Sequence, residues 1–169
     1  RQMCIRDRKY IERWALMRNS VSENICEHSL EVAMLAHGLG IIGRKRFGKD
    51  LSPERLAMLG MYHDCTEIIT GDMPTPVKYA NDELKEAYKA IEDSAAHRLL
   101  EMLPEDLRAE YESYFLPEQI TPEEYRYVKA ADKLSALIKC IEEEKTGNQE
   151  FRSAKPVSYT HLRAHETEL

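Results

Sequence analysis

The sequence predicts an all-α protein folded as a single domain. Apolar residues recur every three or four positions through most of the chain between residues 9 and 145, which is the period of a helix. No stretch sustains the apolar–polar alternation of a strand, and proline or capping residues mark several expected helix ends. The 169 residues are enough for one domain with a sizeable core.

Composition and charge narrow the class of protein. The formal net charge is −6, with 43% hydrophobic and 32% charged residues. A non-specific nucleic-acid binder needs a basic face, so we expect no nucleic-acid polymer as a partner. No run of about 18 apolar residues is present and neither end resembles a secretory signal, so we expect no membrane partner. The four cysteines form no CxxC pair or disulfide framework, which favours reduced thiols and a cytoplasmic protein.

Both ends of the chain differ from the middle. Residues 1–8 and 156–169 show little helical periodicity, and both strings resemble the translated sequencing-adapter sequence found at the ends of some open reading frames. We therefore interpret residues 9–155 as the domain and give the two ends no function. On this interpretation the native amino terminus and a native carboxy-terminal helix are missing. Ordinary frayed termini are the alternative.

The first expected helix carries an arginine–tryptophan pair. Residues 9–18 have the pattern of a short amphipathic helix that contains Arg13 and Trp14, and a polar connection rich in capping residues follows over 19–24. Taken alone, Trp14 would more often be a core anchor than part of a site.

The second expected helix, over about residues 27–40, places a histidine on its apolar face. That face consists of His28, Val32, Leu35 and Leu39. Three glycines at positions 38, 40 and 43 are expected to end this helix, and an exposed basic loop should follow over residues 44–52.

A third expected helix holds the adjacent pair His63 and Asp64. Ser52 and Pro53 upstream have the pattern of an N-cap and a first helical residue, and the helix should run until residues 70–72 break it. A stiff, proline-containing loop follows.

Three ionisable groups of this helix lie on or beside its buried stripe. On a 3.6-residue period His63 and Glu67 share a stripe with Leu56, and Asp64 lies beside them. Burying a lone carboxylate is very costly, so these groups need a partner, and a divalent cation would serve all of them.

The last three expected helices cover residues 82–103, 105–115 and 121–145. Pro104 should stop the first of them, and a capping box of Thr121 and Glu124 should open the third. On that third helix Asp132 lies on an apolar stripe between Lys129 and Lys133.

Four ionisable side chains are therefore expected to point inward from three helices: His28, His63, Asp64 and Asp132. Two imidazoles and two carboxylates suit a borderline divalent ion such as Mn²⁺, Co²⁺, Fe²⁺, Ni²⁺ or Zn²⁺. Taken singly, an inward histidine is more often a hydrogen-bonded core residue than a ligand, and Asp132 could equally pair with an arginine. The conjunction of the four indicates a metal site.

This order of residues, His…His-Asp…Asp on successive helices, resembles the HD-domain superfamily of metal-dependent phosphohydrolases. The flanking strings are more specific, and over about residues 9–155 they resemble the bacterial 5′-deoxynucleotidase family of the YfbR type. These strings are RWALMR at 13–18, ENICEHSLEVAMLAH at 23–37, MYHDCTEIITGDMPTPVKY at 61–79, YKAIE at 88–92 and VKAADKLSALIKCIEE at 128–143.

The resemblance implies a single HD-domain helical bundle that hydrolyses deoxyribonucleoside 5′-monophosphates to the deoxynucleoside and phosphate. It also implies a homodimer. One divalent transition-metal ion, Co²⁺, Mn²⁺ or similar, would be held by His28, His63, Asp64 and Asp132. The catalytic residues would be Arg13 on the 5′-phosphate, Glu67 as the acid/base residue beside the metal-bound water, and Asp64.

The resemblance further implies how the sugar is recognised. Asp72 would bind the 3′-hydroxyl, and Trp14 would pack against the sugar and disfavour a 2′-hydroxyl, which gives a preference for deoxyribose. Met73 stands where leucine is usual in the family, a volume-conserving change. The full set expected around the substrate is Arg13, Trp14, His28, Asp64, Asp72, Met73, Pro74, Thr75 and Asp132.

Attack by metal-bound water is the expected mechanism, because a divalent ion lowers the pKa of its water towards about 7 and no side chain stands out as a covalent nucleophile. One alternative is another HD phosphohydrolase, acting on nucleoside triphosphates or on cyclic or signalling nucleotides. It would need more basic residues than Arg13, Arg18 and Lys78. A second alternative is a non-catalytic nucleotide-binding HD protein, against which the intact ligand set and Glu67 argue.

Overall fold

The computed structural model describes residues 5–78, 80–152 and 154, and this part of the chain contains helices and no strand. The all-α prediction is confirmed. In chain order the elements are η1 (Ile5–Tyr10), α1 (Ile25–Phe47), α2 (Pro53–Tyr62), α3 (Glu67–Thr70), α4 (Thr75–Lys78), α5 (Asp82–Glu101), α6 (Glu105–Phe115), η2 (Pro117–Gln119), α7 (Pro122–Lys145) and η3 (Glu150–Arg152).

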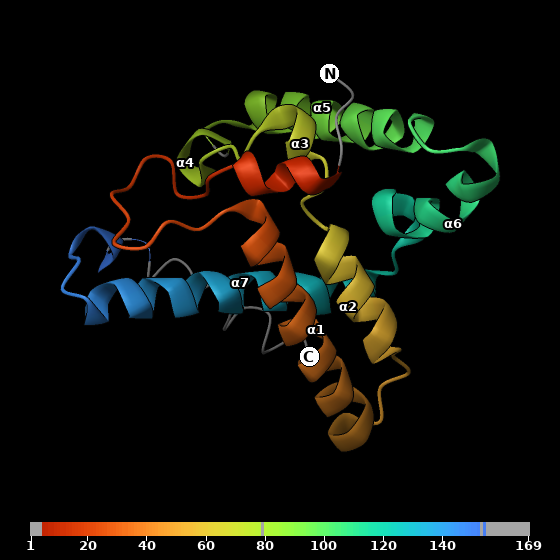
Figure 1. The fold of residues 1–169 in the computed structure, drawn as a ribbon. Coiled ribbons are helices and arrows are strands. Elements are labelled where there is room, and N and C mark those ends of the chain that lie inside the picture. Colours follow the sequence, from red (N-terminus) through yellow and green to blue (C-terminus); the bar gives the residue numbers. More distant parts are fainter. Residues whose placement is uncertain (1–4, 79, 153, 155–169) are drawn as a thin grey trace.

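The helices pack in two groups, which meet where α2 ends. In the first group α1 lies along α2 and crosses α7 (Figure 1). Its buried core is Val32, Ala36, Leu51, Leu56, Leu59, Tyr127, Val128 and Ala131. In the second group α5 packs against α3, α4 and α6. Its core is Cys65, Ala96, Leu99, Leu100, Phe115 and Leu116. His63 and Asp64 follow α2 directly and therefore lie at the junction of the two groups.

Glycines allow α1 to approach its neighbours closely. A Cβ atom built on Gly40 would lie 2.7 Å from Cδ1 of Leu56, and one built on Gly43 would meet the ring of Tyr127. The prediction that these glycines end the helix is therefore wrong. The helix continues to Phe47 and ends at Gly48 with φ +65°, so the basic residues 44–46 lie exposed in its last turn instead of in a loop.

The prediction of a helix over residues 9–18 is also wrong. Only Ile5–Tyr10 is helical, as a 3₁₀ helix, and residues 11–24 form an irregular segment that we call the strap. The amide of Arg13 donates to the carbonyl of Glu23 at 2.9 Å, and the amide of Ile25 donates to that of Ile11 at 2.9 Å. These bonds across the strap replace the bonds of a helix, and Trp14 takes a left-handed φ of +61°.

The single helix expected from residue 56 to residue 70 is interrupted at the functional pair. α2 stops at Tyr62, a turn follows over residues 63–66, and the short α3 begins at Glu67. Hydrogen bonds from Cys65 to the carbonyl of Tyr62 (2.9 Å) and from Glu67 to that of Asp64 (3.1 Å) tighten this turn. The last three helices are confirmed to within two residues, and the capping box of Thr121 and Glu124 opens α7.

α1 has the length and composition of a membrane-spanning helix, although 39% of its most apolar window is buried. These two criteria are weak evidence, because the core helices of soluble proteins meet them too. In this molecule α1 packs against α2 and α7. The expectation of no membrane partner stays a prediction.

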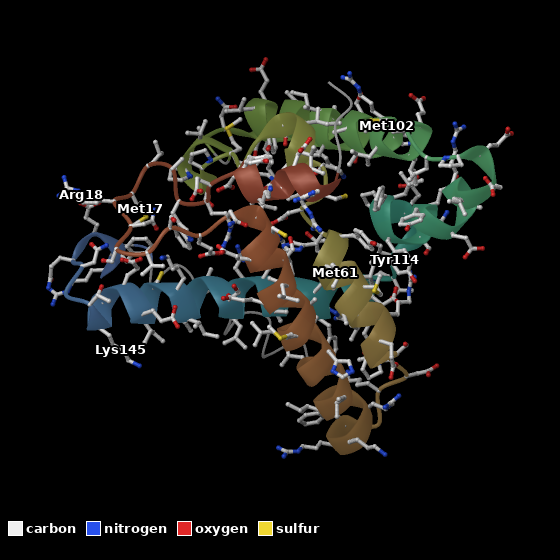
Figure 2. All side chains as sticks on the ribbon, in the orientation of Figure 1. Met17, Arg18, Met61, Met102, Tyr114 and Lys145 are labelled. Carbon is white, nitrogen blue, oxygen red and sulfur yellow. The ribbon has the colours of Figure 1, made fainter. Side chains whose placement is uncertain are left out.

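The two chain ends that the sequence sets apart are only partly described. Residues 156–169 lie outside the described residues, so their interpretation as non-native stays a prediction. In the first segment, Arg8 is buried and its Nη1 donates to the carbonyl oxygen of Met61 at 2.6 Å; Met61 is labelled in Figure 2.

Candidate active site

His63 is held in one tautomer by the backbone. Its Nδ1 lies 2.7 Å from the carbonyl oxygen of Gly60, near the end of α2. Since a carbonyl can only accept, Nδ1 carries the proton and Nε2 of the neutral ring presents a lone pair. That lone pair lies 3.0 Å from Oδ2 of Asp64.

His28 of α1 brings a second imidazole to the same point. It is fully buried, and its Nε2 lies 3.6 Å from Oδ2 of Asp64 and 3.3 Å from Oδ1 of Asp132 on α7. Ligand atoms of His28, His63 and Asp64 all lie within 4.8 Å of one another. Three regions that lie far apart in the sequence therefore contribute to one cluster. We call His28, His63 and Asp64 the His–Asp cluster, and Asp132 adds a carboxylate at its edge.

The geometry of the His–Asp cluster fits a metal ion. No hydrogen bond of acceptable geometry reaches Nε2 of His28 or Nε2 of His63 from the described part of the chain, although both atoms are buried. Ligand bonds of about 2.1 Å at angles of about 90–109° keep two ligand atoms about 3.0–3.4 Å apart. The observed separations of 3.0, 3.3 and 3.6 Å are close to this range. Two imidazoles and a carboxylate at these separations are therefore a donor set that suits a divalent ion.

Asp132 shares its charge between the cluster and two lysines. Its Oδ2 lies 3.0 Å from Nζ of Lys129 and 3.7 Å from Nζ of Lys133, while its Oδ1 faces His28. Burial alone would raise the pKa of Asp132, but Lys129 and the contact with His28 outweigh it and hold that pKa well below its usual range. The sequence left an arginine or a metal ion as possible partners of Asp132. In the structure its Oδ2 pairs with two lysines, and its Oδ1 faces the cluster.

Glu67 is a buried carboxyl group beside the cluster. Its Oε2 is buried and has no hydrogen-bond partner in the described residues. Burial, followed by the charges of Asp64 and Asp72, raises the pKa of Glu67 to about 10. The group therefore carries a proton at neutral pH in the metal-free protein and can donate it.

Arg13 and Trp14 lie on the strap against the cluster. Nη1 of Arg13 lies 2.8 Å from Nδ1 of His28 and pairs with Oε1 of Glu23. The backbone of Trp14 and the charge of Arg13 act on the carboxylate of Asp72 and oppose the rise in its pKa that burial causes, so Asp72 lies near the strap. The indole of Trp14 also packs on Phe151, with ring centroids 5.2 Å apart, which makes it a core contact as well.

The three residues after Asp72 differ in how far they are exposed to solvent. Met73 and Pro74 are half-buried, whereas Thr75 is exposed at the start of α4. Their contact with a substrate stays a prediction.

A cavity of about 440 Å³ adjoins the cluster. His63 and Asp64 form part of its wall, and Lys78, Lys85 and Lys89 line it from the region of α4 and α5. Glu92 and Asp93 line the cavity too, and Nζ of Lys78 lies 2.7 Å from Oε1 of Glu92, so the approach to the His–Asp cluster carries charges of both signs.

Sequence reasoning missed two residues that support His28. Glu23 contacts its Nδ1 at 3.4 Å and Ser135 of α7 contacts it at 3.2 Å. Ser135 follows Asp132 by three residues and shares its helix face, which is a signal that could have been used. Glu23 precedes the helix in a polar segment, so only its burial in the folded chain reveals it.

Comparison with known proteins places this chain in a family. Residues 2–168 match the profile described as 5'-deoxynucleotidase YfbR-like. The chain belongs to this family. A 5'-deoxynucleotidase of Vibrio cholerae is 51% identical over 147 residues, which cover 87% of this chain and 76% of the relative. A 5'-deoxynucleotidase of Erwinia tasmaniensis is also 51% identical over 147 residues, covering 87% of this chain and 74% of that protein.

Solved structures agree with this family and with its fold. An HD-domain phosphohydrolase from Listeria innocua superposes with a TM-score of 0.85 at 22% identity, covering 96% of this chain and 78% of that one. A cyanophage S-2L HD phosphohydrolase, bound to dA and one catalytic Zn²⁺ ion, superposes with a TM-score of 0.57 at 26% identity, covering 80% and 68%. The resemblance read from the His…His-Asp…Asp order is confirmed.

Proposed function

We propose that this chain is a metal-dependent enzyme that hydrolyses deoxyribonucleoside 5′-monophosphates to the deoxynucleoside and phosphate. The observation that carries the proposal is the convergence of His28, His63 and Asp64 on one point, with the buried carboxyl group of Glu67 beside them. The family match and relatives named 5'-deoxynucleotidases support the reaction class.

One divalent transition-metal ion, Co²⁺, Mn²⁺ or similar, is proposed to bind His28, His63, Asp64 and Asp132. The Zn²⁺ of the cyanophage relative supports an ion of this class. Such an ion, when bound, acts as a Lewis acid and activates water for hydrolysis.

Glu67 is the proposed proton donor to the leaving 5′-oxygen. Its carboxyl group is buried beside the proposed ligand Asp64, and its Oε2 has no hydrogen-bond partner among the described residues. A carboxyl group in this position can transfer a proton when negative charge develops on the departing oxygen.

Arg13 is the proposed phosphate ligand. A guanidinium has five N–H donors, and both of the contacts described above use Nη1 of Arg13, so its remaining donors are available for a phosphoryl oxygen. Its positive charge is fixed, because it is held from behind by Glu23.

Deoxyribose selectivity is assigned to Trp14 and Asp72. The backbone of Trp14 influences the pKa of Asp72, which supports a site where an apolar wall and a hydroxyl acceptor act together. Met73, Pro74 and Thr75 are proposed to complete this wall, and His28, Asp64 and Asp132 to border the phosphate.

A homodimer in the cytoplasm is the proposed working state. Exposed Ile91 on α5 is an apolar side chain suited to a subunit contact. Cys26, Cys65 and Cys140 are free thiols, as is usual in a reducing compartment. Sedimentation velocity of the wild type and of Ile91→Glu tests the dimer.

Phosphate release from dAMP, AMP and dATP, measured side by side with Co²⁺ present, tests the function. The proposal predicts the highest kcat/KM for dAMP and loss of all release with a chelator. If dATP is hydrolysed far faster than dAMP, the chain is a different HD phosphohydrolase. If Co²⁺ binds but no deoxymononucleotide is hydrolysed, it is a binding protein.

A further inference from the structure

The second half of the strap is fixed by side chains from the end of α7 and from the residues that follow it. The strap passes beside this end of α7 (Figure 1). Oε2 of Glu143 accepts from the amide of Ser20 at 2.9 Å. The side-chain amide of Asn148 donates to the carbonyl of Arg18 at 2.7 Å and to Oε2 of Glu143 at 2.7 Å. The segment that carries Arg13 and Trp14 is therefore attached to the last part of the described chain.

Phe151 of η3 connects this attachment to a site residue. Its side chain is fully buried, and its ring packs on the indole of Trp14, with centroids 5.2 Å apart and planes inclined by 57°. Nζ of Lys139, which donates to the carbonyl of Val21 in the strap, lies 5.7 Å from the centroid of the same ring. Phe151 thus contacts both α7 and the strap.

Trp14 has a backbone conformation that needs such support. Its φ of +61° lies in the left-handed region, which is unfavourable for a bulky residue and persists only where the surroundings fix it. Nε1 donates to Oε2 of Glu23 at 3.2 Å, and the ring of Phe151 supplies the apolar contact. The side chain is only half-buried, so part of the indole stays accessible to a ligand.

We propose that Phe151 is a positioning residue that holds the indole of Trp14 in place and thereby sets the preference for deoxyribose. The preference rests on the proposed function, in which Trp14 excludes a 2′-hydroxyl. A wall of this kind rejects the extra hydroxyl only as long as it cannot move aside. The ring of Phe151 limits that movement without touching the substrate.

Phe151→Leu tests the proposal, with kcat and KM measured for dAMP and AMP in the presence of Co²⁺. Loss of the ring leaves space beside the indole, so the ratio of kcat/KM for dAMP to that for AMP should fall about tenfold, within the range that an apolar pocket discriminates. A higher KM should account for most of the loss with dAMP, because no proposed ligand or proton donor is changed.

The wild type separates this inference from the function on which it rests. A wild type without preference for dAMP overturns both. A selective wild type together with an equally selective Phe151→Leu variant overturns the role of Phe151 alone.

The fluorescence of Trp14 provides a readout that needs no turnover. Trp14 is the one tryptophan of the chain, so the emission reports on this side chain alone. Quenching by acrylamide should increase in Phe151→Leu, and the fluorescence anisotropy should fall, because the indole loses a packing partner. Quenching and anisotropy at their wild-type values would show that Phe151 does not hold the indole, and the proposal would fail.

Leu100→Ala is the matched control for lost stability. Leu100 is also buried, but it belongs to the core of the group formed by α5 and α6. The variant should unfold at a lower urea concentration and keep the wild-type substrate ratio and the wild-type quenching of Trp14. An equal fall of the ratio in both variants would mean that Phe151 acts only through stability, which overturns its positioning role.

Phe151→Met replaces Phe151→Leu if the leucine variant does not fold. Methionine is unbranched and adapts to an irregular gap, so it keeps part of the apolar contact with Trp14. Its substrate ratio and its quenching should both move in the direction expected for Phe151→Leu. A folded methionine variant that matches the wild type in both measurements contradicts the proposal.

Discussion

Single side chains define the chemistry of this protein, and Glu67 is the clearest test of it. Its carboxyl group is buried beside Asp64 and Asp72, and these surroundings raise its pKa to about 10. The sequence placed Glu67 on the buried stripe with His63, but periodicity cannot report how deeply a carboxylate is buried.

Glu67→Gln should lower kcat for dAMP by about 10²–10⁴-fold, the usual contribution of a general acid. The variant keeps the shape of the side chain and removes its exchangeable proton. Metal content, measured on the same preparation by mass spectrometry, should stay at one equivalent, since Glu67 is outside the proposed ligand set. A variant with near wild-type kcat would show that another group donates the proton.

The proposed ligand residues could be singled out from the sequence because each is an ionisable group on or beside an apolar helical stripe. His28 and Asp132 stand out in this way on α1 and α7. Glu23 carried no such signal. Its neighbours in space, Arg13 and His28, become neighbours only through the strap, whose left-handed Trp14 no propensity scale predicts.

At the scale of elements, the close approach of α1 and α2 brings His28 and the end of α2 together. Gly60 on α2 faces the backbone of α1, and a Cβ there would lie 3.0 Å from Cα of Ala33 and 3.1 Å from the carbonyl carbon of Val32. Backbone atoms cannot move aside as a flexible side chain can.

Gly60→Ala should therefore destabilise the protein, whereas Gly38→Ala should not. Overpacking costs about 1–3 kcal/mol, and alanine recovers about 0.5–1 kcal/mol of helix propensity, so the expected net loss for Gly60→Ala is about 0–2.5 kcal/mol. A Cβ on Gly38 would meet nothing within 4 Å, so only the gain of about 0.5–1 kcal/mol remains there. Urea unfolding of both variants measures the difference, and equal effects would show that the contact is not tight.

Helix boundaries were less predictable than helices. The glycines of α1 signal helix ends to any local rule, yet Gly40 and Gly43 provide room for Leu56 and Tyr127. The break after Tyr62 was not predictable either, because the residues on both sides keep a helical apolar period. In both cases packing against other elements decided the outcome.

At the scale of the whole molecule, the proposed ion joins parts of the chain that lie far apart in the sequence. His28 comes from α1, His63 and Asp64 from the turn after α2, and Asp132 from α7. An ion bound to the folded chain alone stabilises it by about 2.7 kcal/mol at a free concentration 100 times its Kd. The all-α class was predictable from periodicity, but the convergence of these elements was not, because periodicity assigns faces and gives no distances between helices.

The most direct test of the account is the anomalous scattering of crystals grown with Co²⁺. We predict a single strong peak within about 2.0–2.3 Å of Nε2 of His28, Nε2 of His63 and a carboxylate oxygen of Asp64, with Asp132 as the fourth ligand. Co²⁺ bound elsewhere, or these side chains bonded to one another without an ion, would contradict the proposed metal centre and the reaction built on it.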